Sequence, residues 1–412
     1  MVETSFPPTN QAWQSRLADL NPQVYAKTRN HLQGAVSRIS PYLTHGFLGL
    51  QEAVAGVRSH SRLEATDKLF SEFAWRSFFH HVWDWAGDSI FKDMRPGLPG
   101  VRYRNELPVD IREARTGLAV IDQAVAALYE TGYLHNHARM WLASYVVHLR
   151  HVHWRAGADW MFGHLLDGDL ASNHLSWQWV AATFSVKPYL FNADNVAKFA
   201  PRSWHCFGTP LDTSYEALEQ MARGLDEDGR GKFESLAQYA RQRSDGLQEP
   251  LLHAVPPPEL SQGALNSVSD LQTWLNSSQW AKGLHRVELT HAWALRSAAI
   301  APGSVGTESL RLGLIHLPAH QGRPWSSRRW QFVIGRMREV CDAVFIGDVT
   351  SLQPAFSCAQ SLVSLDSPGS PLTREAIASL RPSWEQPTPW LTPPPRSCQS
   401  FSSYIRAVRE LR

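Results

Sequence analysis

The fold of this chain is decided by residues 131–192, which read TGYLHNHARMWLASYVVHLRHVHWRAGADWMFGHLLDGDLASNHLSWQWVAATFSVKPYLFN. Apolar residues recur here at helical spacing, yet the stretch holds more Trp, His, Arg, Asn and Asp than a helical core needs. On one expected helix, Asn136, Arg139 and Met140 stand three and four residues apart and therefore share a face. This face can form the wall of a polar pocket in an all-helical unit.

Two carboxylates of the same stretch, Asp167 and Asp169, precede a helical run in which Asn173 and Trp177 share a face. Buried carboxylates need partners, because burying an unpaired charge costs several kcal/mol. The nearest candidate in the pocket wall is Arg139. We therefore predict an ion pair between Arg139 and one of these aspartates.

Two upstream segments carry further polar groups. SEFAWRSFFHHVWDW at residues 71–85 places Glu72 and Arg76 one turn apart beside Trp75, which is equally typical of an exposed ion pair next to an aromatic core face. AVSRISPYL at residues 35–43 opens a helix with Ser40 as its cap and a proline in the first turn. Hydroxyls and free backbone N–H groups at such a start suit a phosphate.

Composition excludes several classes of protein. With 412 residues, 43% hydrophobic content and a net charge of +2, the chain is expected to be globular and not a binder of nucleic acid through a basic tail. It has no apolar run near the ~20 residues that cross a bilayer, and its start has no secretory signal pattern. The cysteines form no C-x-x-C pair, which indicates reduced thiols and a cytoplasmic location. The cysteines are Cys206, Cys341, Cys358 and Cys398.

No metal site is expected, because the histidines lack carboxylate or cysteine partners at ligand spacing.

Between about residues 201 and 276 the chain becomes rich in charged residues, small residues and prolines. This composition predicts a connection with one helix over 214–223 and otherwise loose packing. The last part alternates an apolar strand at 312–316, a helix at 327–340 and a strand at 343–346, which is typical of an α/β domain.

These patterns predict a mainly α protein in four parts. They are an N-terminal extension at 1–24, a helical domain at 25–205, a linker with a helical extension at 206–285, and a small α/β domain at 286–412.

The polar segments occur in an order that resembles a known family. S-R-I-S-P-Y-L, E-x-x-W-R-x-F-F, H-N-x-x-R-M, W-R-x-G and L-x-D-G-D-L-A-x-N-x-x-x-W-Q-W together resemble the FAD-binding helical domain of DNA photolyases and cryptochromes over residues 25–200. The resemblance implies FAD as cofactor. It implies that FAD is held by Tyr25, Ser37, Arg38, Ile39, Ser40, Arg76, Arg139, Asp167, Gly168, Asp169 and Asn173, with Asn173 facing flavin N5.

The resemblance also implies a substrate: its pocket residues are most similar to those of cyclobutane pyrimidine dimer photolyases. Light-driven electron transfer from reduced FAD would split the dimer in DNA, with catalytic roles for Glu72, Asn173, Trp177 and Trp154. The substrate would be contacted by Arg29, Glu72, Trp75, Asn136, Met140 and Trp179. The (6-4) subfamily favours a histidine pair where this chain has Asn136 and Met140, so that substrate is less expected.

Two departures from the family keep other functions open. Trp177 and Trp154 match two members of the family's electron-transfer chain, but Ile111 stands at the distal place, so Trp160 or Trp141 substitutes or photoreduction is slow. The alternatives to repair are a cryptochrome-like blue-light or redox sensor, signalling to a protein partner through the C-terminal half, and a flavoprotein with an unassigned reaction.

The second departure concerns domain order. The family's α/β antenna domain would need about 200 residues before the helical domain, and only 24 stand there. Residues 325–348 and 400–410 faintly resemble the helix, strand and closing segment of that domain. Our hypothesis is a displaced or circularly permuted antenna-like domain at 286–412, and the alternative is an unrelated or degenerate α/β module.

Overall fold

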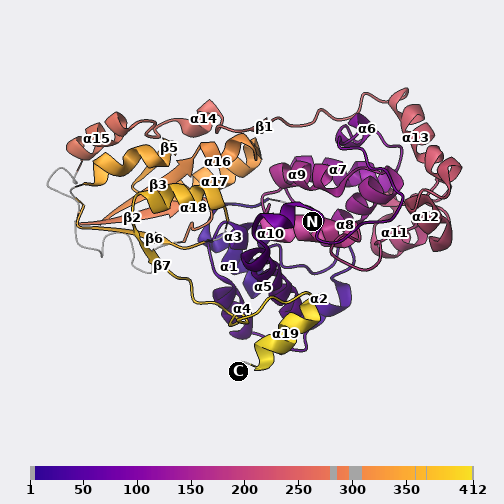
Figure 1. Ribbon diagram of the computed structural model, residues 1–412, viewed down its shortest axis with the longest axis horizontal. Coiled ribbons are helices and arrows are strands. Elements are labelled where there is room, and N and C mark those ends of the chain that lie inside the picture. Colours follow the sequence, from indigo (N-terminus) through magenta and orange to yellow (C-terminus); the bar gives the residue numbers. More distant parts are fainter. Residues whose placement is uncertain (1–4, 279–284, 297–308, 358, 368, 411–412) are drawn as a thin grey trace.

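The computed structural model describes residues 5–410 except 279–284, 297–308, 358 and 368, and joins a helical part to a parallel sheet (Figure 1). The helical part contains α1 (Asn10–Ala18), α2 (Pro22–Thr28), α3 (Ser40–Thr44), α4 (Leu50–Arg58), α5 (Lys68–Ala86), η1 (Gly87–Phe91), α6 (Val109–Arg112), α7 (Ala119–Thr131), α8 (Asn136–Ser144), η2 (Tyr145–Leu149), α9 (Trp154–His164), α10 (Leu170–Val180), α11 (Ala193–Phe199), η3 (Arg202–Trp204), α12 (Tyr215–Ala222) and α13 (Glu227–Arg241). None of the described helices is long and apolar enough to cross a membrane.

Residues at the helix ends decide where the helices around residues 131–192 begin and end. Helix α7 ends at Gly132, whose φ of 67° is the left-handed conformation that glycine adopts without a Cβ penalty. Helix α10 begins after Asp169, whose carboxylate accepts a hydrogen bond from the backbone N–H of Ser172. The predicted cap role of Ser40 is wrong, because Ile39 is the N-cap of α3 and the Ser40 hydroxyl donates to Asp167 instead.

The region expected to be a loose connection is ordered over much of its length. The predicted helix is present as α12, and it is followed by the 15-residue helix α13. Leu218 of α12 and Phe233 of α13 are fully buried in the same core as Trp141 of α8. Loose packing is therefore the wrong expectation here, because these two side chains extend the apolar core of the helical part.

The remaining elements form a sheet with its covering helices. They are β1 (Leu252–His253), α14 (Pro258–Ser261), α15 (Val268–Ser277), β2 (Arg286–His291), β3 (Ser309–His316), α16 (Pro318–Gln321), β4 (Trp325–Ser326), α17 (Ser327–Val340), β5 (Ala343–Gly347), η5 (Val349–Phe356), β6 (Ser361–Leu365), α18 (Pro371–Ser379), β7 (Ser383–Glu385) and α19 (Phe401–Glu410). The predicted alternation of strand, helix and strand is confirmed by β3, α17 and β5.

The five strands β5-β3-β2-β6-β7 pair in that order, all in parallel. Numbered by their succession in the chain, they give the order 3-2-1-4-5, which belongs to doubly wound nucleotide-binding sheets. Apolar residues of α15, η5 and α18 pack on one face of the sheet. Helix α17 packs against β3 and β5.

The two halves share one hydrophobic core. Phe332 of α17 stacks on Phe47 of the helical part, with ring centroids 5.0 Å apart and planes inclined by 16°. Helix α19, yellow in Figure 1, leaves the sheet and packs against α5. The α/β half therefore touches the helical half at α17 and α19. Among the described cysteines, Cys206, Cys341 and Cys398 are free thiols, while Cys358 lies outside the described residues.

Candidate functional site

A cavity of about 500 Å³ lies among α5, α8 and α10. Most of the residues that the sequence singles out line this one space. They are Ser40, Glu72, Trp75, Arg76, Asn136, Arg139, Met140, Asp167, Asn173, Trp177 and Trp179. Residues from positions 40 to 179 of the chain therefore converge on one place.

Asp167 is the centre of the first polar cluster. Arg139 Nη2 donates to both of its carboxylate oxygens, at 3.0 and 2.8 Å, and the Ser40 hydroxyl donates to Oδ2 at 2.6 Å. The predicted ion pair is thus present. It ties α3 and α8 to the loop before α10, and charge-assisted hydrogen bonds of this kind are short and strong.

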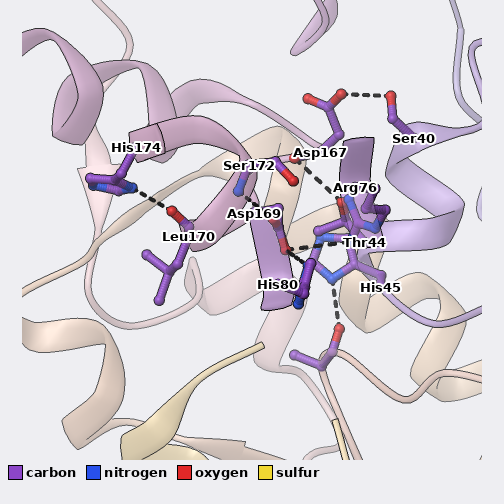
Figure 2. Close-up of polar contacts among 12 residues, drawn as sticks. Ser40, Thr44, His45, Arg76, His80, Asp167, Asp169, Leu170, Ser172 and His174 are labelled. Atoms are coloured by element: carbon purple, nitrogen blue, oxygen red, sulfur yellow. Dashed lines mark hydrogen bonds and ion pairs between the residues drawn. The ribbon is translucent and has the colours of Figure 1, made fainter. Parts of the chain in front are cut away.

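Asp169 is the centre of the second cluster (Figure 2). Its side chain is 3% exposed and accepts from Ser172 N at 2.7 Å, His80 Nε2 at 3.0 Å and Arg76 Nη2 at 3.4 Å. Burial by itself raises the pKa of this carboxyl group. The charges and hydrogen bonds of His80, Arg76 and Ser172 outweigh it and hold the pKa well below its usual range.

The lining contains polar groups that suit a polar ligand. Arg76, Arg139 and Asn173 on the cavity wall supply guanidinium and amide donors, which suit the phosphate and carbonyl acceptors of a nucleotide. Asn173 is held by a hydrogen bond from Nδ2 to Ala158 O at 2.9 Å. The size and these groups fit FAD.

Trp177 forms an aromatic part of the wall. A Cβ at Gly157 would lie 2.3 Å from the Trp177 ring, so the glycine of the W-R-x-G segment lets this indole pack against α9. Trp154, one turn before Gly157, is buried outside the cavity and donates from Nε1 to Asp93 at 2.6 Å. Ile111 is fully buried in the core of the helical part.

The other end of the cavity holds the residues expected to meet a substrate. Arg29 Nη1 donates to Glu72 Oε1 at 2.7 Å, and Arg76 pairs with Asp169. Glu72 and Arg76 therefore do not form the ion pair with each other that their spacing also allowed. Burial raises the pKa of Glu72, and the charges of Arg29 and Lys68 oppose that shift.

The aromatic residues at this end differ in exposure. Trp75 stacks on Phe401 of α19 with centroids 4.1 Å apart and planes inclined by 7°, so one face of the indole is covered. Trp179 is 38% exposed and lies 6.0 Å from the Tyr189 ring. Asn136 Nδ2 lies 3.5 Å from Met140 Sδ, one turn along α8.

Several predicted cofactor residues lie apart from the lining of this cavity. Tyr25 is buried near Arg29 and Glu72. Ile39 belongs to the core, and Gly168 packs against Arg329. Arg38, at a φ of 51°, lines a separate cavity of about 140 Å³. Ser37 and Asp169 also stand outside the lining of the larger cavity.

Four residues near the site were not predicted from the sequence. They are His80, Ser172, Phe401 and Arg329. His80 stands one turn after Arg76, and that spacing is a signal for a second ligand of Asp169. No comparable local signal exists for Phe401 and Arg329, which come from the distant α/β half. Within the described ranges, no group of three or more His, Cys, Asp or Glu side chains is placed to hold a metal ion.

Comparison with known proteins identifies the helical part. The family model for the FAD binding domain of DNA photolyase matches residues 69–203. A deoxyribodipyrimidine photo-lyase of Streptomyces griseus is 36% identical over 149 residues, which cover 36% of this chain and 32% of that protein. One of Synechococcus sp. is 31% identical over 195 residues, covering 44% and 39%. A cryptochrome DASH of Oryza sativa is 29% identical over 167 residues, covering 39% and 29%.

Solved structures show a partial likeness. A Synechocystis sp. cryptochrome superposes with a TM-score of 0.43 at 22% identity, covering 57% of this chain and 55% of that one. An archaeal photolyase from Sulfolobus tokodaii, solved with two FAD molecules, gives a TM-score of 0.40 at 23% identity, covering 56% and 54%.

The chain spans about a third of the length of the curated relatives it matches first. Residues 69–203, which match the family model, contain the cavity-lining segments of α5, α8 and α10. FAD is the cofactor of this domain. Residues 69–203 are an FAD-binding domain of the DNA photolyase type, and this part of the chain is similar to photolyases and cryptochromes.

Proposed function

We propose that this protein repairs cyclobutane pyrimidine dimers in DNA by light-driven electron transfer. The observation that carries the proposal is that two sets of residues line one cavity. Arg76, Arg139 and Asn173 belong to the set assigned to FAD, and Glu72 and Trp179 to the set assigned to the dimer. When bound, reduced FAD would supply the electron that splits the dimer ring and would take it back from the separated pyrimidines.

The residues of the chain hold and orient the two ligands. Ion pairs with Asp167 and Asp169 hold Arg139 and Arg76 in place, so both guanidinium groups are oriented at the cavity wall before a ligand binds. The exposed ring of Trp179 at the mouth can stack on a base flipped out of the DNA. Flipping costs a few kcal/mol, least for a damaged base, and stacking returns about 1–3 kcal/mol per base.

Glu72 is assigned the role of hydrogen-bond partner to the dimer. Burial raises its pKa, so Glu72 takes up a proton more readily than a free carboxylate and can then donate a hydrogen bond to a dimer carbonyl. Arg29 holds the carboxyl group from the outside and is itself placed to meet a DNA phosphate. The proposal takes support from relatives named deoxyribodipyrimidine photo-lyase, which share the cavity-bearing domain.

The test is direct repair. The reduced, FAD-loaded protein is illuminated with dimer-containing single- and double-stranded DNA, and recovery of pyrimidine absorbance is followed. We expect recovery in light and none in the dark. Glu72→Gln should slow recovery while retaining FAD, whereas Glu64→Gln should leave the rate unchanged, because Glu64 pairs with Arg62 on the exposed surface. Bound, reduced flavin without recovery in the wild type would reject repair.

A sensor function is the second candidate, and the contact between Trp75 and Phe401 favours it. The stacked pair joins the cavity wall directly to the C-terminal helix α19, so a change in the cavity can reach that helix. Hydrogen exchange of α19 in light and darkness tests this idea. Light-dependent exchange without dimer repair would favour the sensor, and unchanged exchange would reject it.

We infer further that residues 286–412 are a displaced antenna-like α/β domain that follows the helical domain at 25–205 and the connection at 206–285. The parallel order 3-2-1-4-5 and the return of α19 to α5 support the inference over an unrelated module. Moving residues 286–410 in front of residue 25 should give a folded protein that binds FAD. An insoluble or FAD-free product would count against the permutation.

A further inference from the structure

Arg329 of α17 belongs to the α/β half, and its side chain contacts the loop that precedes α10. Its side chain is fully buried, Nη1 donates to Phe162 O at 3.1 Å, and Nη2 donates to Gly168 O at 2.6 Å. The guanidinium also lies 4.1 Å from the ring centroid of Trp325. No ion pair to Arg329 is found among the described residues, so carbonyl groups and aromatic faces accept its charge.

The approach of Arg329 explains the glycine between the two aspartates. A Cβ at Gly168 would lie 2.4 Å from Arg329 Nη1 and 2.6 Å from Phe162 O, so any larger residue would displace the guanidinium or the backbone. The resemblance assigns Gly168 to the cofactor, but the structure turns it toward Arg329. The glycine is therefore required by a residue of the α/β half.

Charge links Arg329 to the carboxylates of the same loop. Burial lowers the pKa of Arg329, and Asp167 and Asp169 act against that shift from the two sides of Gly168. Arg329 binds the backbone of the loop at Gly168 O, while Arg139 and Arg76 pair with the carboxylates of Asp167 and Asp169. The loop is thus fixed between guanidinium groups of both halves.

We propose that Arg329 is a positioning residue for the flavin site, by which the α/β half holds the Asp167–Gly168–Asp169 loop in its binding geometry. The inference rests on the FAD binding of the proposed function and is independent of repair. It gives the α/β half a role in cofactor retention that needs no antenna chromophore. In metal sites, removing such a supporting partner costs about 10–100-fold in affinity, and we expect an effect of that order.

The test compares two buried arginines of one helix in the full-length protein. Arg329→Met should weaken FAD binding, measured by equilibrium dialysis, by about tenfold or more. Arg336→Met is the matched control: Arg336 is also fully buried on α17, but it donates to Leu295 O and Glu339. It should lower the melting temperature of the FAD-free protein and leave the FAD dissociation constant within about twofold, because it does not touch the loop.

Hydrogen exchange gives a second readout without cofactor. The amide of Leu166, which donates to Gly132 O, should exchange faster in FAD-free Arg329→Met than in Arg336→Met. Gly168→Ala should also weaken FAD binding, and by a smaller factor when Arg329 is already Met, because one of its two clashes is then relieved. If Arg329→Met fails to fold, Arg329→Lys replaces it and should weaken binding to a lesser degree.

Unchanged FAD affinity in the Arg329 variant, or an equal loss in the Arg336 control, would overturn the inference. A wild-type protein that fails to bind FAD would instead refute the proposed function. The two failures are therefore distinguishable in one set of measurements.

Discussion

The sharpest prediction concerns Asp169, because this carboxylate has two separable roles. It caps α10 through the backbone N–H of Ser172, and it pairs with His80 and Arg76. Asp169→Asn keeps a good cap but removes the charge, whereas Asp169→Ala removes both. Comparing the two variants therefore measures each role by itself.

The expected magnitudes follow from the contacts. A hydrogen bond to a charged group contributes about 1.5–3 kcal/mol, and Asp169 is nearly fully buried, so Asp169→Asn should lower the free energy of unfolding of the FAD-free protein by about 2–3 kcal/mol at pH 7. Loss of the cap adds about 1 kcal/mol in Asp169→Ala. Urea unfolding followed by circular dichroism measures both values, and both variants should release FAD.

The pH dependence has a definite sign. The folded-state pKa of Asp169 is depressed, so its stabilisation is fully present above the unfolded pKa of about 3.9 and is lost as the pH falls through the folded value. The stability gap between wild type and Asp169→Asn should be present at pH 5 and shrink below about pH 4. A gap that is the same at pH 3 and pH 7, or equal losses in the two variants, would refute this reasoning.

Three further predictions concern other contacts. Gly132→Ala should destabilise by about 1–2 kcal/mol in urea unfolding, because alanine resists the left-handed conformation. Arg150→Met should cost about 3–5 kcal/mol by leaving the Asp110 carboxylate buried and unpaired, and Asp110→Asn added to it should recover part of the loss. Phe401→Ala should expose Trp75, shift its fluorescence to the red and speed proteolysis within α19, while unchanged cleavage would show that the stack does not hold the helix.

Local patterns predicted much of the helical part. The left-handed Gly132 and the spacing of Asn136, Arg139 and Met140 depend on neighbours a few residues away, so periodicity and turn chemistry could reveal them. The same holds for α17, whose apolar stripe fixes its bounds. The prediction that Ser40 caps α3 is wrong for the opposite reason, since its hydroxyl donates to Asp167, 127 residues away.

The sequence by itself indicated the FAD domain and many of the residues that line the cavity, because these rest on motifs whose order and local spacing can be read directly. Only the tertiary structure decided the partners of those residues. Glu72 meets Arg29 and not Arg76, Trp75 meets Phe401, and Gly168 meets Arg329 across 161 positions of sequence. Such pairings depend on how the α/β half docks on the helices, and docking buries shared apolar surface that no local pattern specifies.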